Sequence, residues 1–229
     1  NGSVISIGTN SSLIVKGTFT TLPSAVLSSS AVTNAEVTLA NNSYLNLAGP
    51  INHQGVLTAT ATGSTVEYSG DDQSIIGTSY HNLLLSQTGS KTASGDIFIN
   101  NNFTVTDATF SPGTHTVTYD KEGDQIITTV PYNNLTIAGT GTKTPNTGLN
   151  IGGNLAVNTG STFSAESFSF NINGNLVNAG GINAGTSQIN LQGGYSGTGT
   201  FLAGSGTVNY RGGTQTVAGL QYYNLGLIN

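Results

Sequence analysis

The chain has 229 residues, of which 36% are hydrophobic and only 7% are charged, and its net charge is −5. A surface that follows nucleic acid phosphates needs a basic stripe, and this chain has only five scattered cations, so nucleic acid binding is excluded: Lys16, Lys91, Lys121, Lys143 and Arg211. Cysteine is absent, which excludes disulfides and thiolate chemistry, and no apolar run approaches the roughly 18 residues of a membrane span.

The N-terminal part of the chain, 1–60, predicts short β-strands. Val-Ile-Ser-Ile at positions 4–7 alternates apolar and polar side chains, and Gly or Asn interrupts such runs every few residues. Nowhere in the chain does a 3.6-residue apolar stripe persist over the roughly 11 residues that indicate a helix. The sequence therefore predicts an all-β protein.

Residues 66–85, 117–137 and 208–227 repeat one frame. It reads Val-x-Tyr, a Gly turn, Gln-x-Ile/Val, and then Tyr-x-Asn-Leu-x-Leu/Ile. The step from the Gln to the Asn has the same length in each copy: Gln73 to Asn82, Gln125 to Asn134, and Gln215 to Asn224. We interpret these six residues as structural positions of a repeat.

The spacing of the copies predicts a parallel β-helix, or β-solenoid. The second copy follows the first by 52 residues and the third follows the second by 90. Turns of roughly 17 to 21 residues fit both offsets if two extra turns separate the later copies, which gives roughly 12 turns stacked into an elongated rod. We expect one domain over residues 1–229, with divergent turns in 1–60 and clear repeats in 61–229. Tandem β-sandwiches are the alternative, but a 52-residue unit is short for a sandwich.

Two sets of repeated residues suggest roles. Gly and Asn suit the corners of a solenoid, and there Asn82, Asn134 and Asn224 would bond their amides to the backbone; otherwise they are exposed turn residues. Tyr68, Tyr119 and Tyr210 share one position of the frame. They would stack on sugar rings if exposed, or fill the core if buried, and the core is favoured because Val-x-Tyr places both side chains on one strand face.

The sequence offers little chemistry. Asp120-x-Glu122-x-Asp124 has alternating oxygen ligands that weakly suggest a surface calcium ion. A glycosidase needs two facing carboxylates, but the acids of the first two copies have no counterpart in the third. The histidines, at positions 53, 81 and 115, lack metal-ligand spacing. We therefore expect no catalytic centre and no cofactor.

The repeat frame, followed by TGTKT and GGNLAVNTGSTF, resembles the β-strand repeats of very large secreted surface proteins of Bacteroidota-type bacteria, which are similar to adhesin repeats. The resemblance covers roughly residues 60–229. It implies an extracellular, cell-surface structural element such as a stalk, adhesin shaft or filament subunit, whose partners are neighbouring repeats or further copies stacked end to end, and surface glycans. A glycan-binding module, an ice-binding surface and a polysaccharide-degrading β-helix enzyme are the alternatives.

Overall fold

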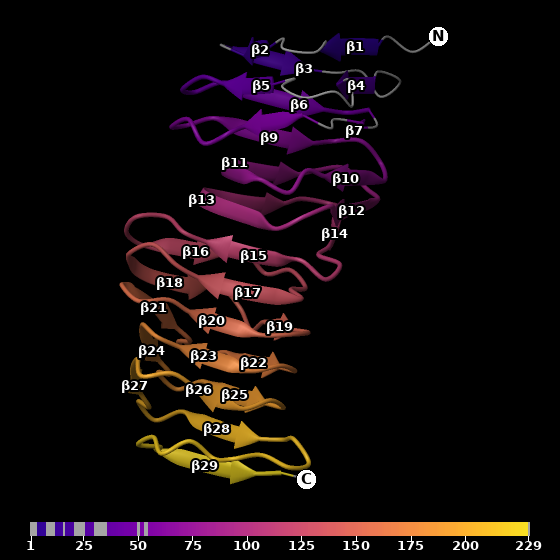
Figure 1. Cartoon of the computed structure of the whole chain (residues 1–229). Coiled ribbons are helices and arrows are strands. Elements are labelled where there is room, and N and C mark those ends of the chain that lie inside the picture. Colours follow the sequence, from indigo (N-terminus) through magenta and orange to yellow (C-terminus); the bar gives the residue numbers. More distant parts are fainter. Residues whose placement is uncertain are drawn as a thin grey trace. The chain divides into compact units, whose positions relative to one another are not determined.

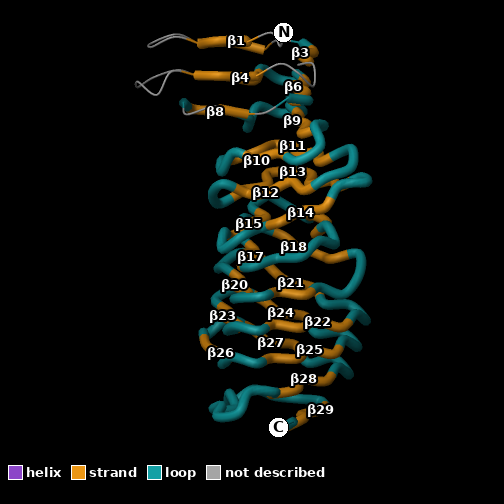
Figure 2. The backbone as a smooth tube through the Cα atoms, turned by 90° about the vertical axis from the view of Figure 1, so that its right-hand side faces the viewer, coloured by secondary structure: helices purple, strands orange, loops and turns teal. Residues whose placement is uncertain are grey.

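The computed structural model describes residues 4–7, 12–15, 17–20, 26–29, 36–49, 51–52 and 55–228. The fold is an all-β parallel β-solenoid of about ten turns, and the described residues contain no helix (Figure 2). By its packing the chain divides into two compact units, Asn1–His115 and Thr116–Asn229. The expectation of one domain stays a prediction.

The first unit stacks short parallel strands in four groups (Figure 1). Three of the groups contain three strands each, two of them at the start of the unit and one nearer its end. The fourth group contains five strands. The groups are β1 (Val4–Ile7), β4 (Val26–Ser29) and β7 (Ile51–Asn52); β2 (Ser12–Val15), β5 (Glu36–Leu39) and β8 (Val56–Thr58); β10 (Gln73–Ile75), β12 (Ser90–Ala93) and β14 (Thr109–Ser111); and β3 (Thr18–Thr20), β6 (Tyr44–Leu47), β9 (Thr65–Tyr68), β11 (Ser79–Leu85) and β13 (Ile97–Val105).

The second unit has three sides, each a stack of five described parallel strands. From β17 to β28, successive strands along the chain visit the three sides in turn, so each of these turns adds one strand to each stack. The stacks are β15 (Thr116–Tyr119), β17 (Asn134–Ile137), β20 (Leu155–Val157), β23 (Leu176–Asn178) and β26 (Tyr195–Ser196); β16 (Gln125–Ile127), β18 (Gly141–Pro145), β21 (Ser161–Ser164), β24 (Gly181–Asn183) and β27 (Thr200–Leu202); and β19 (Asn150–Ile151), β22 (Ser169–Ile172), β25 (Gln188–Leu191), β28 (Thr207–Tyr210) and β29 (Asn224–Leu227).

The alternation of the sequence fills a core inside each unit. In β6, Leu45 and Leu47 are fully buried while their neighbours are half-exposed. In the second unit, Phe163 and Phe170 meet edge to face across the interior with ring centroids 5.3 Å apart, a favoured aromatic arrangement. The period-2 pattern of the sequence therefore indicated the inner and outer faces of these strands correctly.

The number of turns is smaller than the sequence predicted. One turn, measured between paired residues, runs from Thr65 to Asn82 and has the expected length. The turn from Thr18 to Tyr44 is considerably longer, because the connections of the first turns are long. Every described strand pair is parallel, which excludes the antiparallel β-sandwich alternative.

The prediction that whole turns separate the copies of the repeat is wrong for the second and third copies. On the face of β15, the residues in register with Val117 are Leu135, Leu155, Leu176 and Tyr195. Val208 of the third copy follows Tyr195 by less than one full turn and belongs to the stack of β28 instead. The two copies are thus separated by four complete turns and part of a fifth, because the intervening turns are longer than the prediction assumed.

Candidate functional site: three tyrosine clasps

The three copies of the repeat build the same local structure. In each, a Thr-Val-x-Tyr strand pairs in parallel with the Asn-Leu strand of the next turn. The register is identical, because the Thr lies opposite the Asn and the Tyr lies opposite the last apolar residue. The strand pairs are β9 with β11, β15 with β17, and β28 with β29.

Two tyrosines close each of these turns. In the first copy, Ile76 N–H donates to Tyr68 Oη (3.1 Å) and Tyr80 Oη donates to Ile76 O (2.6 Å). The two hydroxyl oxygens are 2.9 Å apart. Because the proton of Tyr80 is directed to the carbonyl, Tyr68 is the donor between the two hydroxyls. The three bonds form a closed ring that satisfies both the N–H and the C=O of Ile76.

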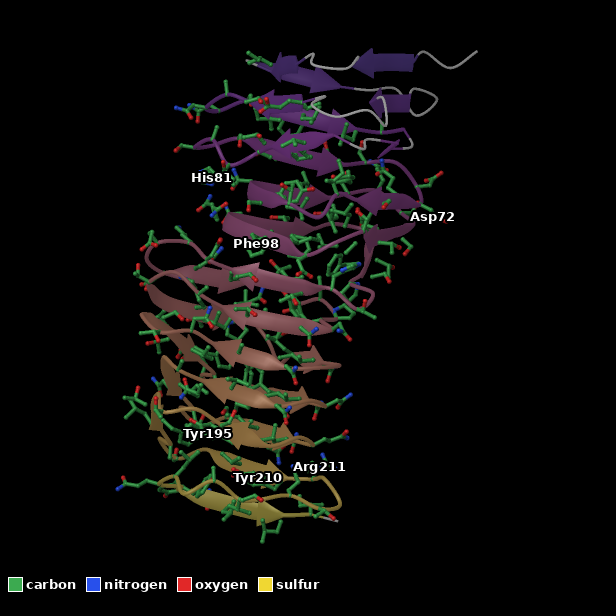
Figure 3. The ribbon with its side chains drawn as sticks, in the orientation of Figure 1. Asp72, His81, Phe98, Tyr195, Tyr210 and Arg211 are labelled. Atoms are coloured by element: carbon green, nitrogen blue, oxygen red, sulfur yellow. The ribbon has the colours of Figure 1, made fainter. Side chains whose placement is uncertain are left out.

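The same ring recurs in the other two copies, and we call each one a tyrosine clasp. The hydroxyl pair is 2.8 Å apart in both, and the bonds to the backbone of the bridged residue are 2.6 to 3.2 Å long. The second clasp joins Tyr119 and Tyr132 through Thr128, and the third joins Tyr210 and Tyr222 through Ala218. Tyr210 is labelled in Figure 3.

Burial of the first tyrosine of each clasp corrects the glycan-stacking interpretation. Tyr68 and Tyr119 are 0% exposed and Tyr210 is 3% exposed, so none of them presents a ring face to a sugar. Burial raises the pKa of Tyr68 to about 12 and raises that of Tyr80 well above its ordinary value of 10. These hydroxyls therefore stay protonated, as the ring of hydrogen bonds requires.

The repeated Gln anchors the corner that precedes the bridged residue. Gln73 Oε1 accepts from Gly70 N (2.7 Å), and its amide nitrogen donates to the carbonyls of Leu47 and Gly49 in the preceding turn. Gln215 likewise accepts from Gly212 N and donates to the preceding turn. In the second copy Gln125 accepts from Lys121 N. The Gln side chain thus provides hydrogen-bond partners for backbone groups at a corner, where no neighbouring strand can provide them.

Two lysines, which sequence analysis treated as scattered charges, are fully buried beside these glutamines. Lys91 lies in register with Gln73, and Lys143 with Gln125. Each ammonium donates to three backbone carbonyls, which matches its three protons. The acceptors, at 2.6 to 3.1 Å, are Gly70, Asp71 and Thr88 for Lys91, and Lys121, Gly123 and Thr140 for Lys143.

Desolvation lowers the pKa of both lysines, and the carboxylates of nearby acids oppose that shift. The signal for this site was present in the sequence as the matched segments Thr-Gly-Ser-Lys-Thr and Thr-Gly-Thr-Lys-Thr, which follow the first and second copies at the same distance. A lysine that recurs at a repeat position with a glycine two positions before it indicated a structural position of the repeat, but not its burial. The glycines, Gly89 and Gly141, both have positive φ.

The repeated asparagines lie in strands, within β11 and at the first positions of β17 and β29, and none of them is buried. Asn82 is half-buried and donates to Ser64 O (2.9 Å). Asn134 is half-buried and accepts from Asn154 N (2.9 Å) in the next turn. Asn224 is exposed. Asn82 and Asn134 therefore bond their amides to the backbone, as the corner interpretation expected, but from strands, and the exposed Asn224 also lies in a strand and not in a turn.

The structure does not bring Asp120, Glu122 and Asp124 together as metal ligands, and nowhere among the described residues do three His, Cys, Asp or Glu side chains gather in that way. Glu122 accepts instead from the hydroxyl of Thr140 (2.7 Å), and Asp124 from Thr142 N (2.8 Å). These carboxylates tie one turn to the next. Of the three histidines, His53 lies outside the described residues.

A ladder of asparagines, which sequence analysis missed, runs along one side of the second unit, where its first two members are exposed and its last two are buried. Each amide nitrogen donates to the amide oxygen of the Asn one turn earlier, at 2.7 to 2.9 Å. The side chains come from β19, β22, β25 and β28 in strict register: Asn150, Asn171, Asn190 and Asn209. Uncharged amides bond along a stack in which like charges would repel.

The first unit also has a polar hollow of about 590 Å³ near the first clasp. Carboxylates and amides line it, and Glu67 already accepts from the hydroxyls of Tyr44 and Ser86 (both 2.5 Å). Its lining residues are Asn46, Ala48, Gly49, Glu67, Ser69, Gly70, Asp71, Asp72, Gln73 and Gln87. Asp72 is labelled in Figure 3.

Comparisons of the chain with protein-family models, with curated proteins and with solved structures gave no match. The described residues include no helix that is long and apolar enough to cross a membrane. The β-solenoid fold rests on the geometry above.

Proposed function

We propose that this chain is a structural segment of an extracellular surface protein, acting as a stalk, adhesin shaft or filament subunit, and that it has no catalytic role. The observation that carries the proposal is the tyrosine clasp, which recurs three times with one hydrogen-bond pattern and one register. An interior device that recurs in all three copies, beside surface acids that the third copy lacks, suits a repeat that resists mechanical force.

The surface residues support a structural role. Acids beside the first two clasps bond to the backbone or hydroxyls of the next turn, as Asp72 does to Ser90 N (2.8 Å). The third copy has Arg211-Gly-Gly-Thr in that place. The carboxylates therefore vary between copies while the tyrosines, Gln and strand register do not. Absence of Cys and Met from the sequence suits an oxidising environment, where both residues are vulnerable.

Single-molecule force spectroscopy tests the mechanical role. The chain is pulled from its two ends, and we expect discrete, high-force unfolding steps in the parent protein. Replacing Tyr68 and Tyr80 with Phe should lower the force of one step, whereas Tyr223→Phe, at a residue 66% exposed, should leave every step unchanged. A parent chain that extends gradually at low force would contradict the proposal. Labelling of intact producing cells with an antibody tests the surface location independently.

Glycan binding is the second candidate, and the polar hollow of the first unit favours it. Carboxylate and amide groups form hydrogen bonds with sugar hydroxyls, and Asp71, Asp72 and Gln87 supply such groups to this hollow. Among the described residues, no aromatic ring lines it. A glycan array probed with the parent chain and with Asp71→Asn/Asp72→Asn tests this role. Binding that the double variant loses would support it, and absence of binding to any glycan would refute it.

A further inference from the structure

The third clasp has a groove with exposed apolar side chains beside it. The groove has a volume of about 240 Å³ and is lined by Tyr210, Gly212, Gly213, Gln215, Val217, Leu227 and Ile228. Val217 is 36% exposed and Leu227 is 69% exposed. Their equivalents in the first copy, Ile75 and Leu85, are completely buried. In the first two copies a further strand covers this surface, and among the described residues no such strand covers it in the third copy.

The cover in the first two copies is a strand with a lysine and, two positions later, a small apolar residue. In the first copy, Lys91 of β12 pairs with Gln73, and Ala93 pairs with Ile75. In the second copy, Lys143 and Pro145 of β18 pair with Gln125 and Ile127 in the same parallel register. Lysine and apolar residue are both buried there.

The third copy presents the same backbone groups to such a strand, with Gly213 and Thr214 where the first copy has Asp71 and Asp72. Gln215 holds the Gly212 turn through the bond by which Gln73 holds the Gly70 turn. The carbonyls of Gly212 and Gly213 therefore correspond to those of Gly70 and Asp71, which accept from the Lys91 ammonium at 2.6 Å. Within the described part of the chain, no donor reaches the oxygen of Gly212 or Gly213. A Cβ on Gly212 would lie 2.3 Å from Gln192 O, so the turn is built tightly against the preceding one.

We propose that this groove binds a parallel β-strand of the form Lys-x-Ala or Lys-x-Pro, carried by a further solenoid turn stacked on β29. The lysine ammonium donates hydrogen bonds to the carbonyl oxygens of Gly212 and Gly213, and the small apolar residue covers Val217. The backbone of the added turn pairs with Gln215–Val217 and with β29, as β12 and β18 pair with their neighbours. The inference rests on the structural role proposed above and names the kind of partner that this end of the second unit accepts.

A graft tests the proposal directly. The sequence of residues 88–105, which carries Lys91 and Ala93, is appended after Asn229 of the full chain, where the frame places it. Hydrogen exchange at residues 212–217 is measured in the parent chain and in the graft. We expect exchange there to slow by at least about tenfold in the graft. The matched control has methionine in place of the grafted lysine and should lose most of that protection.

Each result has one meaning. Protection that requires the lysine and is independent of protein concentration supports the proposal. Equal protection with methionine would refute the lysine seat, absence of protection would refute the docking of a turn, and protection that appears only at high concentration would assign the groove to a second copy instead. Hydrogen exchange measures only the docking of the added turn. A negative result would therefore refute this inference without refuting the structural role, which force spectroscopy and antibody labelling test.

Discussion

Removal of one hydroxyl from the first clasp provides the sharpest test of the hydrogen-bond ring. Tyr68→Phe keeps the ring of a side chain that is 0% exposed and deletes only its oxygen. Ile76 N–H then loses its acceptor, while Tyr80 keeps its bond to Ile76 O. An unsatisfied buried donor costs roughly 1–3 kcal/mol. We therefore expect Tyr68→Phe to lower the free energy of unfolding by about 2 kcal/mol.

The companion variant and the double variant measure the coupling. Tyr80→Phe leaves Ile76 O without its donor and Tyr68 without its acceptor, so it should cost a similar amount. Since both single variants break one closed ring, their effects should not add. The double variant should cost about 1 kcal/mol less than the sum of the single ones, the coupling typical of residues in one network.

Urea unfolding followed by circular dichroism gives the free energies, and exchange of the Ile76 amide gives the local opening. Tyr223→Phe is the control, because that residue is 66% exposed and should change stability by less than about 0.5 kcal/mol. Single variants that match this control, or costs that add fully in the double variant, would refute the ring.

Three further predictions concern the lysines, the glycines and pH. Lys143→Met should lower the free energy of unfolding by about 2–4 kcal/mol, because three buried carbonyls lose a charged donor, and this loss exceeds the gain from no longer burying a charge. An unchanged midpoint of urea unfolding would contradict this. Gly141→Ala should cost about 2–4 kcal/mol, since φ is +70° and a Cβ would lie 2.6 Å from Gly123 C. Gly123→Ala should cost only about 1 kcal/mol, because its φ is also positive but its Cβ has open space; equal losses would show that space is unimportant. The raised pKa of Tyr68, about 12 against 10 unfolded, gives stability that is complete below pH 10 and lost as pH rises to 12. Urea unfolding at a series of pH values should show that loss in the parent chain and a smaller one in Tyr68→Phe; equal losses would contradict it.

Much of the fold could be predicted from the sequence because it depends on local rules. Alternation in Thr-Val-x-Tyr decides which side chains enter the core, and the spacing from Thr65 to Asn82 is the length of one turn. The face on which a copy lies could not be predicted in this way. It depends on the summed length of all the turns before it. A small error in the predicted length of each turn therefore adds up, and the prediction placed Val208 on the wrong side.

The candidate site was partly visible. Both tyrosines of each clasp stand in the repeated frame, yet only the structure shows that their hydroxyls meet and enclose one backbone residue. The buried lysines were harder to foresee, since Lys is almost never fully buried without partners. The partners of Lys91 are backbone carbonyls, which every residue carries, so no side chain in the sequence indicated them.

The change of face between the second and third clasps shows what the clasp requires. Tyr119 begins on the stack of β15 and Tyr210 on the stack of β28, but their hydroxyl pairs have the same 2.8 Å separation. A device that works on two sides of a three-sided solenoid depends on its own turn and the adjacent one, not on a particular side of the molecule. Selection for a binding or catalytic surface would hold copies to one face, where their side chains could act together. Selection for cohesion between turns places no such condition, because each clasp stabilises the turns that it joins wherever it lies.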